Sequence, residues 1–127
     1  MTAAQYVPGT CNIGPEEIAL RRRAGHVGLA VTAALGAALL RSGLHPAWRL
    51  ALALPAAGAA SGYLQARQRF CANYGFRGLY NFEGRGHEQP VPVAGAQDED
   101  RRRSLQIAAT SAAIGAGVAL VAVAAGR

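Results

Sequence analysis

The chain has 127 residues, of which 51% are hydrophobic, and thirteen basic residues against seven acidic ones give it a formal net charge of +6. This length holds one small domain and leaves little material for a separate soluble core, which argues against a sizeable enclosed active site. Nucleic-acid binding is not expected either, because no stacking motif or groove-reading helix accompanies the basic residues.

Three long stretches carry almost no charge: Ala24 to Leu40, Leu50 to Leu64, and Leu105 to Gly126. Backbone inside a lipid bilayer must satisfy its own hydrogen bonds, and a run of Ala, Leu, Val and Gly does this as an α-helix. The sequence therefore predicts an all-α fold, an integral membrane helical hairpin followed by a third transmembrane helix. The expected division is a cytoplasmic N-terminal segment 1–14, a hairpin with an interfacial extension 15–82, a cytoplasmic linker 83–97 and the third helix 98–127.

Arginines gather where the apolar stretches end, on what would be a single side of the membrane. Because basic residues favour the cytoplasmic side, this pattern predicts a bacterial inner-membrane protein with a cytoplasmic N-terminus. Attraction to anionic lipid headgroups is enough to explain the charge, so membrane lipids are expected partners. The residues expected at the membrane interface are Arg21, Arg22, Arg23, Trp48, Arg67, Arg69, Arg101, Arg102 and Arg103.

The first helix has clear boundary signals. Pro15 suits the first helical position, Asn12 or Gly14 can cap it, and acidic residues follow in the first turn. The helix is expected to end near Leu40, before a Ser-Gly pair.

The second helix follows a return turn at His45 and Pro46 and is expected to enter the membrane near Trp48. It is predicted to continue beyond the bilayer to about Tyr74, with Gly75 available as a left-handed cap. An acidic run followed by three arginines predicts the start of the third helix.

Small residues recur at every fourth position on all three helices, a spacing that lets helix backbones approach closely in lipid. An Ala- and Gly-rich segment also produces this spacing by chance. The positions predicted to pack are Gly28, Gly36, Gly58, Gly62, Ala113 and Gly117.

The most chemically suggestive pair is Cys11, before the first helix, and Cys71, after the membrane part of the second. An antiparallel hairpin brings both to one membrane face. Arg67, Arg69 and Arg77 are close in sequence to Cys71, where they could increase its thiolate fraction as a redox or sulfur-carrying thiol requires. The alternatives are that Cys71 is a small buried apolar residue and that Cys11 is incidental.

No other group of residues predicts catalysis. His26, His45 and His87 lack the spacing of metal ligands, so neither a metal nor another cofactor is expected. The absence of a carboxylate within the apolar stretches argues against a proton relay.

Two short motifs resemble those of the YgaP-like transmembrane domain family. The first is an Asn-x-Gly start followed by an acidic residue, an arginine and a glycine, and the second is a Phe-Cys pair followed by a Tyr and a Gly. In this chain Ala72 stands where the family commonly has proline, and a third helical segment is added. The matching residues are Asn12, Ile13, Gly14, Glu17, Arg21 and Gly25, then Phe70, Cys71, Tyr74 and Gly78.

The resemblance implies a two-helix membrane hairpin with both ends in the cytoplasm. Some members are fused to rhodanese sulfurtransferase domains, so it also implies Cys71 as a candidate for sulfur handling or for contacting such a partner. The leading hypothesis is a non-enzymatic helical scaffold that pairs with itself or with a larger membrane protein. Thiol chemistry at Cys71 and an accessory role in a membrane complex are the alternatives.

Overall fold

The computed structural model describes residues 6–83, 87–91 and 95–125. The chain is mostly helical, as expected, and also contains one pair of two-residue strands that the sequence did not indicate. The elements are α2 (Pro15–Arg41), η1 (Pro46–Leu52), α3 (Ala53–Gln68), α4 (Ala72–Arg77), β1 (Leu79–Tyr80), β2 (Gln89–Pro90) and α5 (Ala96–Ala125).

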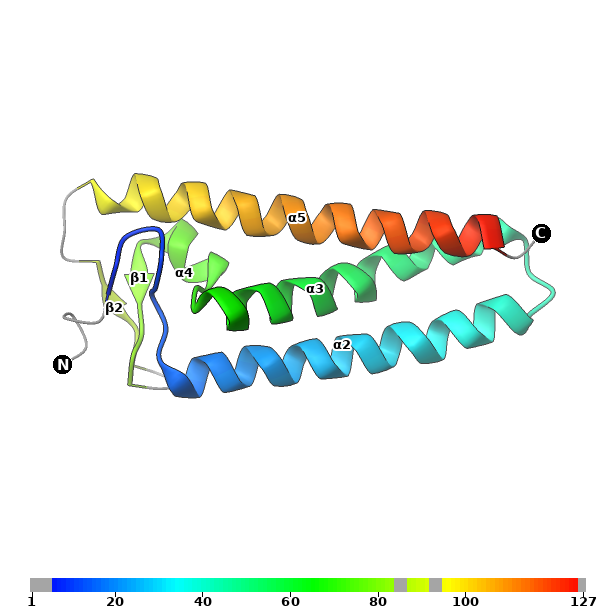
Figure 1. Cartoon of the computed structure of the whole chain (residues 1–127), viewed down its shortest axis with the longest axis horizontal. Helices are drawn as coiled ribbons and strands as arrows, with labels where there is room; N and C mark the ends of the chain where they lie inside the picture. Colours follow the sequence, from blue (N-terminus) through cyan, green and yellow to red (C-terminus); the bar gives the residue numbers. More distant parts are fainter. Residues whose placement is uncertain (1–5, 84–86, 92–94, 126–127) are drawn as a thin grey trace.

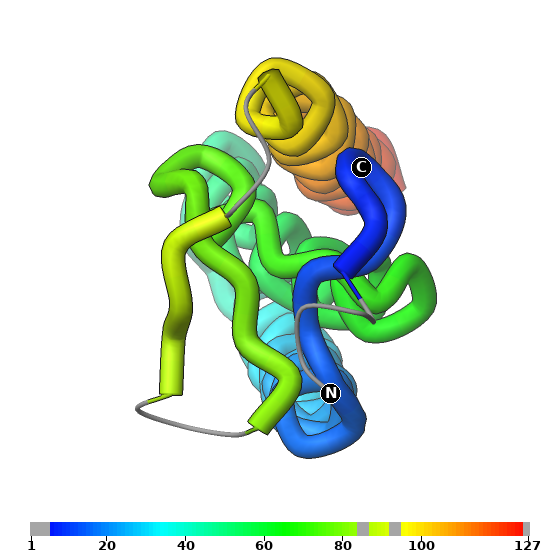
Figure 2. The backbone as a smooth tube through the Cα atoms, turned by 90° about the vertical axis from the view of Figure 1, so that its left-hand side faces the viewer, coloured from blue at the N-terminus to red at the C-terminus, as the bar shows by residue number. Residues whose placement is uncertain are grey.

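The three long helices lie side by side along the long axis, with α3 between α2 and α5 (Figure 1). α3 runs antiparallel to both of its neighbours. Its two interfaces hold the bundle together, because α2 and α5 make few contacts with each other. The N-terminal segment, α4 and the antiparallel β1–β2 pair lie across one end of the bundle, as the end-on view shows (Figure 2).

The predicted boundaries of the first helix are confirmed. Gly14 is its N-cap, Pro15 occupies the first helical position, and Glu16 and Glu17 lie in the first turn, where the helix dipole favours negative charge. The helix ends at Arg41.

The second segment begins as the 3-10 helix η1 rather than as an α-helix. His45 starts it by accepting a hydrogen bond from the backbone N–H of Ala47 at 3.1 Å. Pro55 then lies in the first turn of α3, where a proline removes no helical hydrogen bond. Because a 3-10 helix rises about 2.0 Å per residue against about 1.5 Å in an α-helix, η1 lengthens a segment that is short of apolar residues.

The expectation that this helix continues to Tyr74 is wrong. α3 ends at Gln68, and Arg69 takes the left-handed conformation with φ 57°. A separate short helix, α4, follows, and Gly75 lies inside it instead of capping α3. The left-handed glycine in this region is Gly78, at φ 71°.

The small-residue positions divide into packed and open ones. A Cβ on Gly62 would lie 2.7 Å from the Gly25 nitrogen, and one on Gly28 would lie 2.9 Å from the Cα of Ala59, so both glycines are required where α2 and α3 cross. A Cβ on Gly36 would make only ordinary contacts with Leu52.

The remaining positions do not pack against any other described part of the chain. A Cβ on Gly58 or Gly117 would meet nothing within 4 Å, and Ala113 is exposed. α5 instead approaches α3 through Gly115, whose added Cβ would lie 2.5 Å from the carbonyl oxygen of Ala53. The expected packing face of the third helix was therefore the wrong one for contacts inside the chain.

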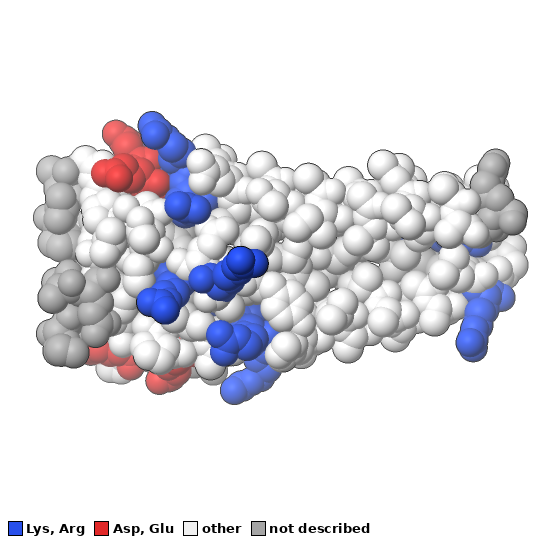
Figure 3. All heavy atoms as spheres, viewed as in Figure 1, with Lys and Arg blue, Asp and Glu red and all other residues white. Residues whose placement is uncertain are grey.

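The sides of the bundle are apolar and open. Large exposed side chains include Leu29 on α2, Leu54 on α3 and Leu120 on α5. In Figure 3 the charged side chains gather over the end closed by α4 and the strands, some lie at the opposite end, and the surface between carries none on this face. By length and composition α2 and α5 are each long and apolar enough to cross a membrane, whereas α3 alone, at 16 residues, is shorter.

Candidate functional site

A polar cluster lies at the end of the bundle that α4 and the strands close, which we call the arginine-rich end. The cluster joins the N-terminal segment to the start of α4. The Asn12 side chain accepts a hydrogen bond from the backbone N–H of Cys71 at 2.7 Å and donates one to its carbonyl oxygen at 3.2 Å. The backbone of Asn12 is also paired, to the carbonyl of Arg69 and the N–H of Asn81. Asn12 is completely buried, so it binds together three separate parts of the chain.

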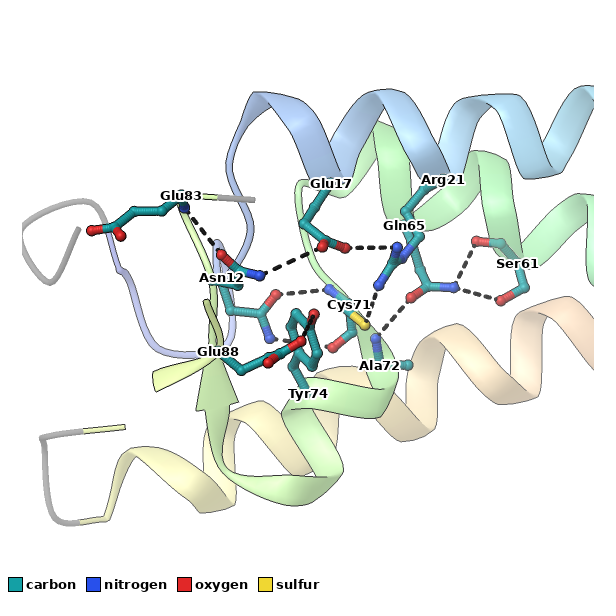
Figure 4. Close-up of polar contacts among 11 residues, drawn as sticks. Asn12, Glu17, Arg21, Ser61, Gln65, Cys71, Ala72, Tyr74, Glu83 and Glu88 are labelled. Atoms are coloured by element: carbon teal, nitrogen blue, oxygen red, sulfur yellow. Dashed lines mark hydrogen bonds and ion pairs between the residues drawn. The ribbon is translucent and has the colours of Figure 1, made fainter. Parts of the chain in front are cut away.

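Cys71 lies next to a guanidinium group. Nη2 of Arg21 is 2.9 Å from Sγ of Cys71, and Nη1 of the same arginine is 2.8 Å from the carboxylate of Glu17 (Figure 4). Glu17 and Cys71 are 3% and 2% exposed. The guanidinium donates to the sulfur, and the burial of the sulfur restricts direct access to it.

The arginine beside Cys71 is not one of those the sequence suggested. Arg67, Arg69 and Arg77 are near Cys71 in the sequence, but the guanidinium that donates to Sγ belongs to Arg21, fifty positions away. The spacing of Glu17 and Arg21, four residues apart on a helix, predicts their ion pair, but nothing local links either of them to Cys71.

Tyr74 and Asn81 complete the cluster. Tyr74 donates a hydrogen bond to Glu88 at 3.3 Å, and its ring lies beneath the guanidinium of Arg21 at 5.9 Å. Burial raises the pKa of the Tyr74 hydroxyl, and nearby acidic groups act in the same direction while a hydrogen bond with Asn81 opposes them. Asn81 donates to Glu17 at 3.5 Å, and its side-chain oxygen accepts from a backbone N–H.

Gln65 fixes the break between α3 and α4 from the other side. Its side-chain oxygen accepts a hydrogen bond from the N–H of Ala72 at 2.9 Å, and its amide nitrogen donates to Ser61 on the preceding turn (Figure 4). The motif resemblance expects proline at position 72, and proline has no N–H to donate. In this chain the N–H of Ala72 is instead bound by the side chain of Gln65.

Cys11 lies at the same end of the molecule, as the hairpin geometry predicted, and both cysteines are free thiols. Cys11 is partly exposed, unlike Cys71. Burial raises the pKa of the Cys11 thiol, although the Ile13 backbone and the charge of Arg69 act in the opposite direction.

A second buried group attaches the N-terminal segment to α5. Asp100, which is completely buried, accepts hydrogen bonds from the Tyr6 hydroxyl at 2.5 Å and from the Gly9 N–H at 2.7 Å. Arg103 donates to the carbonyl of Gly9 at 2.8 Å. Burial and the carboxylate of Asp100 raise the pKa of Tyr6, which keeps its hydroxyl protonated as the donor.

The histidines lie apart and make local contacts. Nδ1 of His26 lies 2.6 Å from the hydroxyl of Tyr63 across the α2–α3 interface, and His45 caps η1. His87 is exposed, 3.9 Å from Glu83. In the described part of the chain, no three side chains of the kind that bind metals come together.

The opposite end of the bundle holds the remaining expected interface residue, Trp48, which is 60% exposed on η1. Its neighbour Arg49 is buried and donates to the carbonyl of Ala122 at 3.0 Å. That carbonyl belongs to the last turn of α5, so Arg49 complements the negative end of the helix dipole.

Comparisons with models of known protein families, with curated proteins and with solved structures found no match.

Proposed function

We propose that this chain is an integral membrane protein of the bacterial inner membrane with three spans and a cytoplasmic N-terminus. The observation that supports this most is the uncharged, apolar middle of the bundle between its charged ends (Figure 3). The rise per residue gives the uncharged part of each span a length of about 25–33 Å, when η1 and α3 are counted as one span. That length is close to the ~30 Å hydrocarbon layer of a bilayer.

Within the membrane, we propose that the protein acts as a helical scaffold that pairs with a second copy or with a larger membrane protein. Gly58, Ala113 and Gly117 support this, because they are exposed small residues on α3 and α5 that no other described helix covers. Small residues exposed to lipid allow another helix to approach closely. An accessory subunit of a larger complex would use the same surfaces.

Chemical cross-linking in membranes and native mass spectrometry in mild detergent test this role. The wild-type protein is expected to appear as an oligomer or with a co-purifying partner. Gly58→Leu and Gly117→Leu should weaken that association, because each fills an open position without disturbing the fold. Ala33→Leu, on an exposed position of α2, is the control. A strictly monomeric protein without a partner would contradict the proposal.

A second candidate function is thiol chemistry at Cys71, favoured by the 2.9 Å contact between its sulfur and Arg21. The motif resemblance to the YgaP-like family, some of whose members carry rhodanese domains, supports a sulfurtransferase as the partner. For this role the buried Sγ would have to become accessible when the partner binds.

Labelling in isolated membranes separates the two candidates. Scaffold function predicts that Cys71 resists a maleimide probe while Cys11 reacts. Thiol chemistry predicts that Cys71 is labelled in membranes from cells that express the partner. It also predicts that Cys71→Ser abolishes the sulfur transfer that depends on this partner. A Cys71→Ser protein that behaves normally would exclude the thiol role.

A further inference from the structure

A pocket of about 780 Å³ opens on the arginine-rich end, distinct from the buried cluster around Cys71. Three parts of the chain line it: the N-terminal segment with the first turns of α2, the end of α3, and the residue that follows Asn81. Its polar lining includes Arg22, Arg67 and Arg69, and its apolar lining includes Ile18 and Phe82.

The three arginines of this pocket have no counter-charge in the part of the chain that the structure describes. Their guanidinium groups make no hydrogen bond or ion pair within the described residues, and no acidic side chain is among the described residues that line the pocket. Arg21 and Arg103, by contrast, are already occupied by Glu17 and by Gly9 and Gln68. All three are exposed, and like charges that line one pocket repel one another, so an anion bound among them would reduce that repulsion.

The positions of the arginines favour a phosphate-bearing ligand. A guanidinium group presents a planar fork of donors that matches phosphate oxygens. Gly14 and Pro15 bring the N-terminal end of the 27-residue α2, the positive end of its dipole, to the same pocket. Ile18 and Phe82 supply apolar surface beside the charges, which a lipid glycerol and the start of an acyl chain would cover.

We propose that this pocket binds the phosphate group of an anionic phospholipid, with Arg22, Arg67 and Arg69 around the phosphate. The proposal rests on the proposed membrane location, because it places the pocket at the level of the headgroups. It goes beyond general attraction of a basic surface to the membrane, since it assigns the lipid to three particular arginines.

Cys11 provides a reporter, because it lines the pocket and is partly exposed while Cys71 is buried. The full-length protein in dodecyl maltoside micelles is labelled with N-ethylmaleimide, and the labelled cysteine is identified by peptide mapping. Micelles contain added phosphatidylglycerol or the same amount of zwitterionic phosphatidylcholine. A third series contains inorganic phosphate, compared with chloride at equal ionic strength.

Phosphatidylglycerol is expected to slow the labelling of Cys11 in the wild type, and phosphatidylcholine is not. Each arginine beside an anionic headgroup changes affinity by roughly fivefold, so the triple variant R22Q/R67Q/R69Q should bind on the order of 100-fold more weakly. The matched triple R77Q/R101Q/R102Q loses the same charge at exposed positions outside the pocket. It should retain clear protection.

Arg69→Gly removes one cation without endangering the fold. Arg69 has a left-handed backbone, which glycine adopts without strain, so this variant should keep or raise its melting temperature while binding roughly fivefold more weakly. Protection is compared within each variant, with and without lipid, so that altered thiol reactivity does not affect the result.

Protection by inorganic phosphate alone would support the phosphate site and assign its ligand to a soluble source. Equal loss of protection in the two triple variants, or no protection by either anion, would overturn the proposal. Carbonate extraction of membranes is measured in parallel. A protein that stays in the membrane while Cys11 is unprotected contradicts only this pocket, whereas an extracted protein contradicts the membrane location.

Discussion

The side chain of Asn12 acts as a strand partner for Cys71, since one amide group bonds both the N–H and the carbonyl of the same residue. Asn12→Ala would leave the N–H of Cys71 without its partner, while the carbonyl of Cys71 would keep the hydrogen bond from the Gly75 N–H. At the usual cost of an orphaned backbone group, the free energy of unfolding should fall by about 1–3 kcal/mol. Thermal unfolding in detergent measures this loss.

Asn73→Ala is the matched control, because Asn73 is exposed on α4 and makes no side-chain hydrogen bond that the described residues account for. Its melting temperature should equal that of the wild type. Equal melting temperatures for the wild type and the Asn12 variant would show that the link to Cys71 does not stabilise the end of the bundle.

The thiol of Cys11 should ionise only at high pH. Its raised pKa, caused mainly by burial, predicts that the pH profile of alkylation by iodoacetamide has its inflection above about 8.5, the value for a free cysteine. Because the charge of Arg69 lowers this pKa, Arg69→Gln should move the inflection higher still, while Arg101→Gln should not. An inflection at or below that of a free cysteine would contradict the prediction.

At the level of helices, one spacing rule selected both Gly58 and Gly62 on α3, and the structure gives them opposite surroundings. The rule identifies small residues on one stripe, but it does not say which part of the stripe another helix covers. The crossing point depends on the tilt between α2 and α3, which is set by all of their contacts together. Gly115 was missed for the same reason, because it lies outside the stripe chosen for the third helix.

These two glycines make a matched pair for mutation. Gly62→Ala places a Cβ 2.7 Å from the Gly25 nitrogen and 2.8 Å from the Arg21 carbonyl oxygen, and backbone cannot move aside cheaply, so a loss of about 1–3 kcal/mol is expected. Gly58→Ala meets open space and should be neutral or stabilise α3 by about 0.5–1 kcal/mol. Thermal unfolding in detergent measures both. Similar melting temperatures for the two variants would contradict the close packing of Gly62 against α2.

Element boundaries could be predicted from the sequence where the signals are local. The start of α2 at Pro15 rests on the proline, the cap and the acidic first turn, all within a few residues. The end of α3 at Gln68 has no such signal, since the left-handed residue there is an arginine. That break depends on distant contacts, from Asn12 to Cys71 and from Ser104 on α5 to the carbonyl of Ala72.

The candidate site was predictable only in part for the same reason. The hairpin brings Cys11 and Cys71 to one end, which follows from the order of the helices. The partner of Cys71, Arg21, follows from the register between α2 and α3, and a single sequence does not report that register. The pocket of three unpaired arginines likewise combines Arg22 with the end of α3, which lies far away in the sequence.

At the scale of the whole molecule, the chain separates its charges along one axis. The N-terminal segment, α4, the strands and the start of α5 form a polar end, and the sides between the two ends are apolar (Figures 1 and 3). At the far end, η1 and the last turn of α5 are joined by the bond from Arg49 to Ala122. A bilayer placed around the apolar middle would therefore leave the larger, more basic end on the side that favours arginine.

This arrangement makes a prediction about topology. Three antiparallel helices place β2, which lies within the linker, and the end of α5 at opposite ends of the bundle (Figure 1). A cytoplasmic reporter such as green fluorescent protein should be active when inserted in the linker, and alkaline phosphatase, which needs the periplasm, should be active when fused after Arg127. Exchanging the two reporters should abolish both signals. Activity of the same reporter at both positions would mean that α5, the helix between them, does not cross. Phosphatase activity in the linker with fluorescence after Arg127 would instead mean that α2 or α3 does not cross, and α3, the shorter, would then be the first to examine by cysteine scanning.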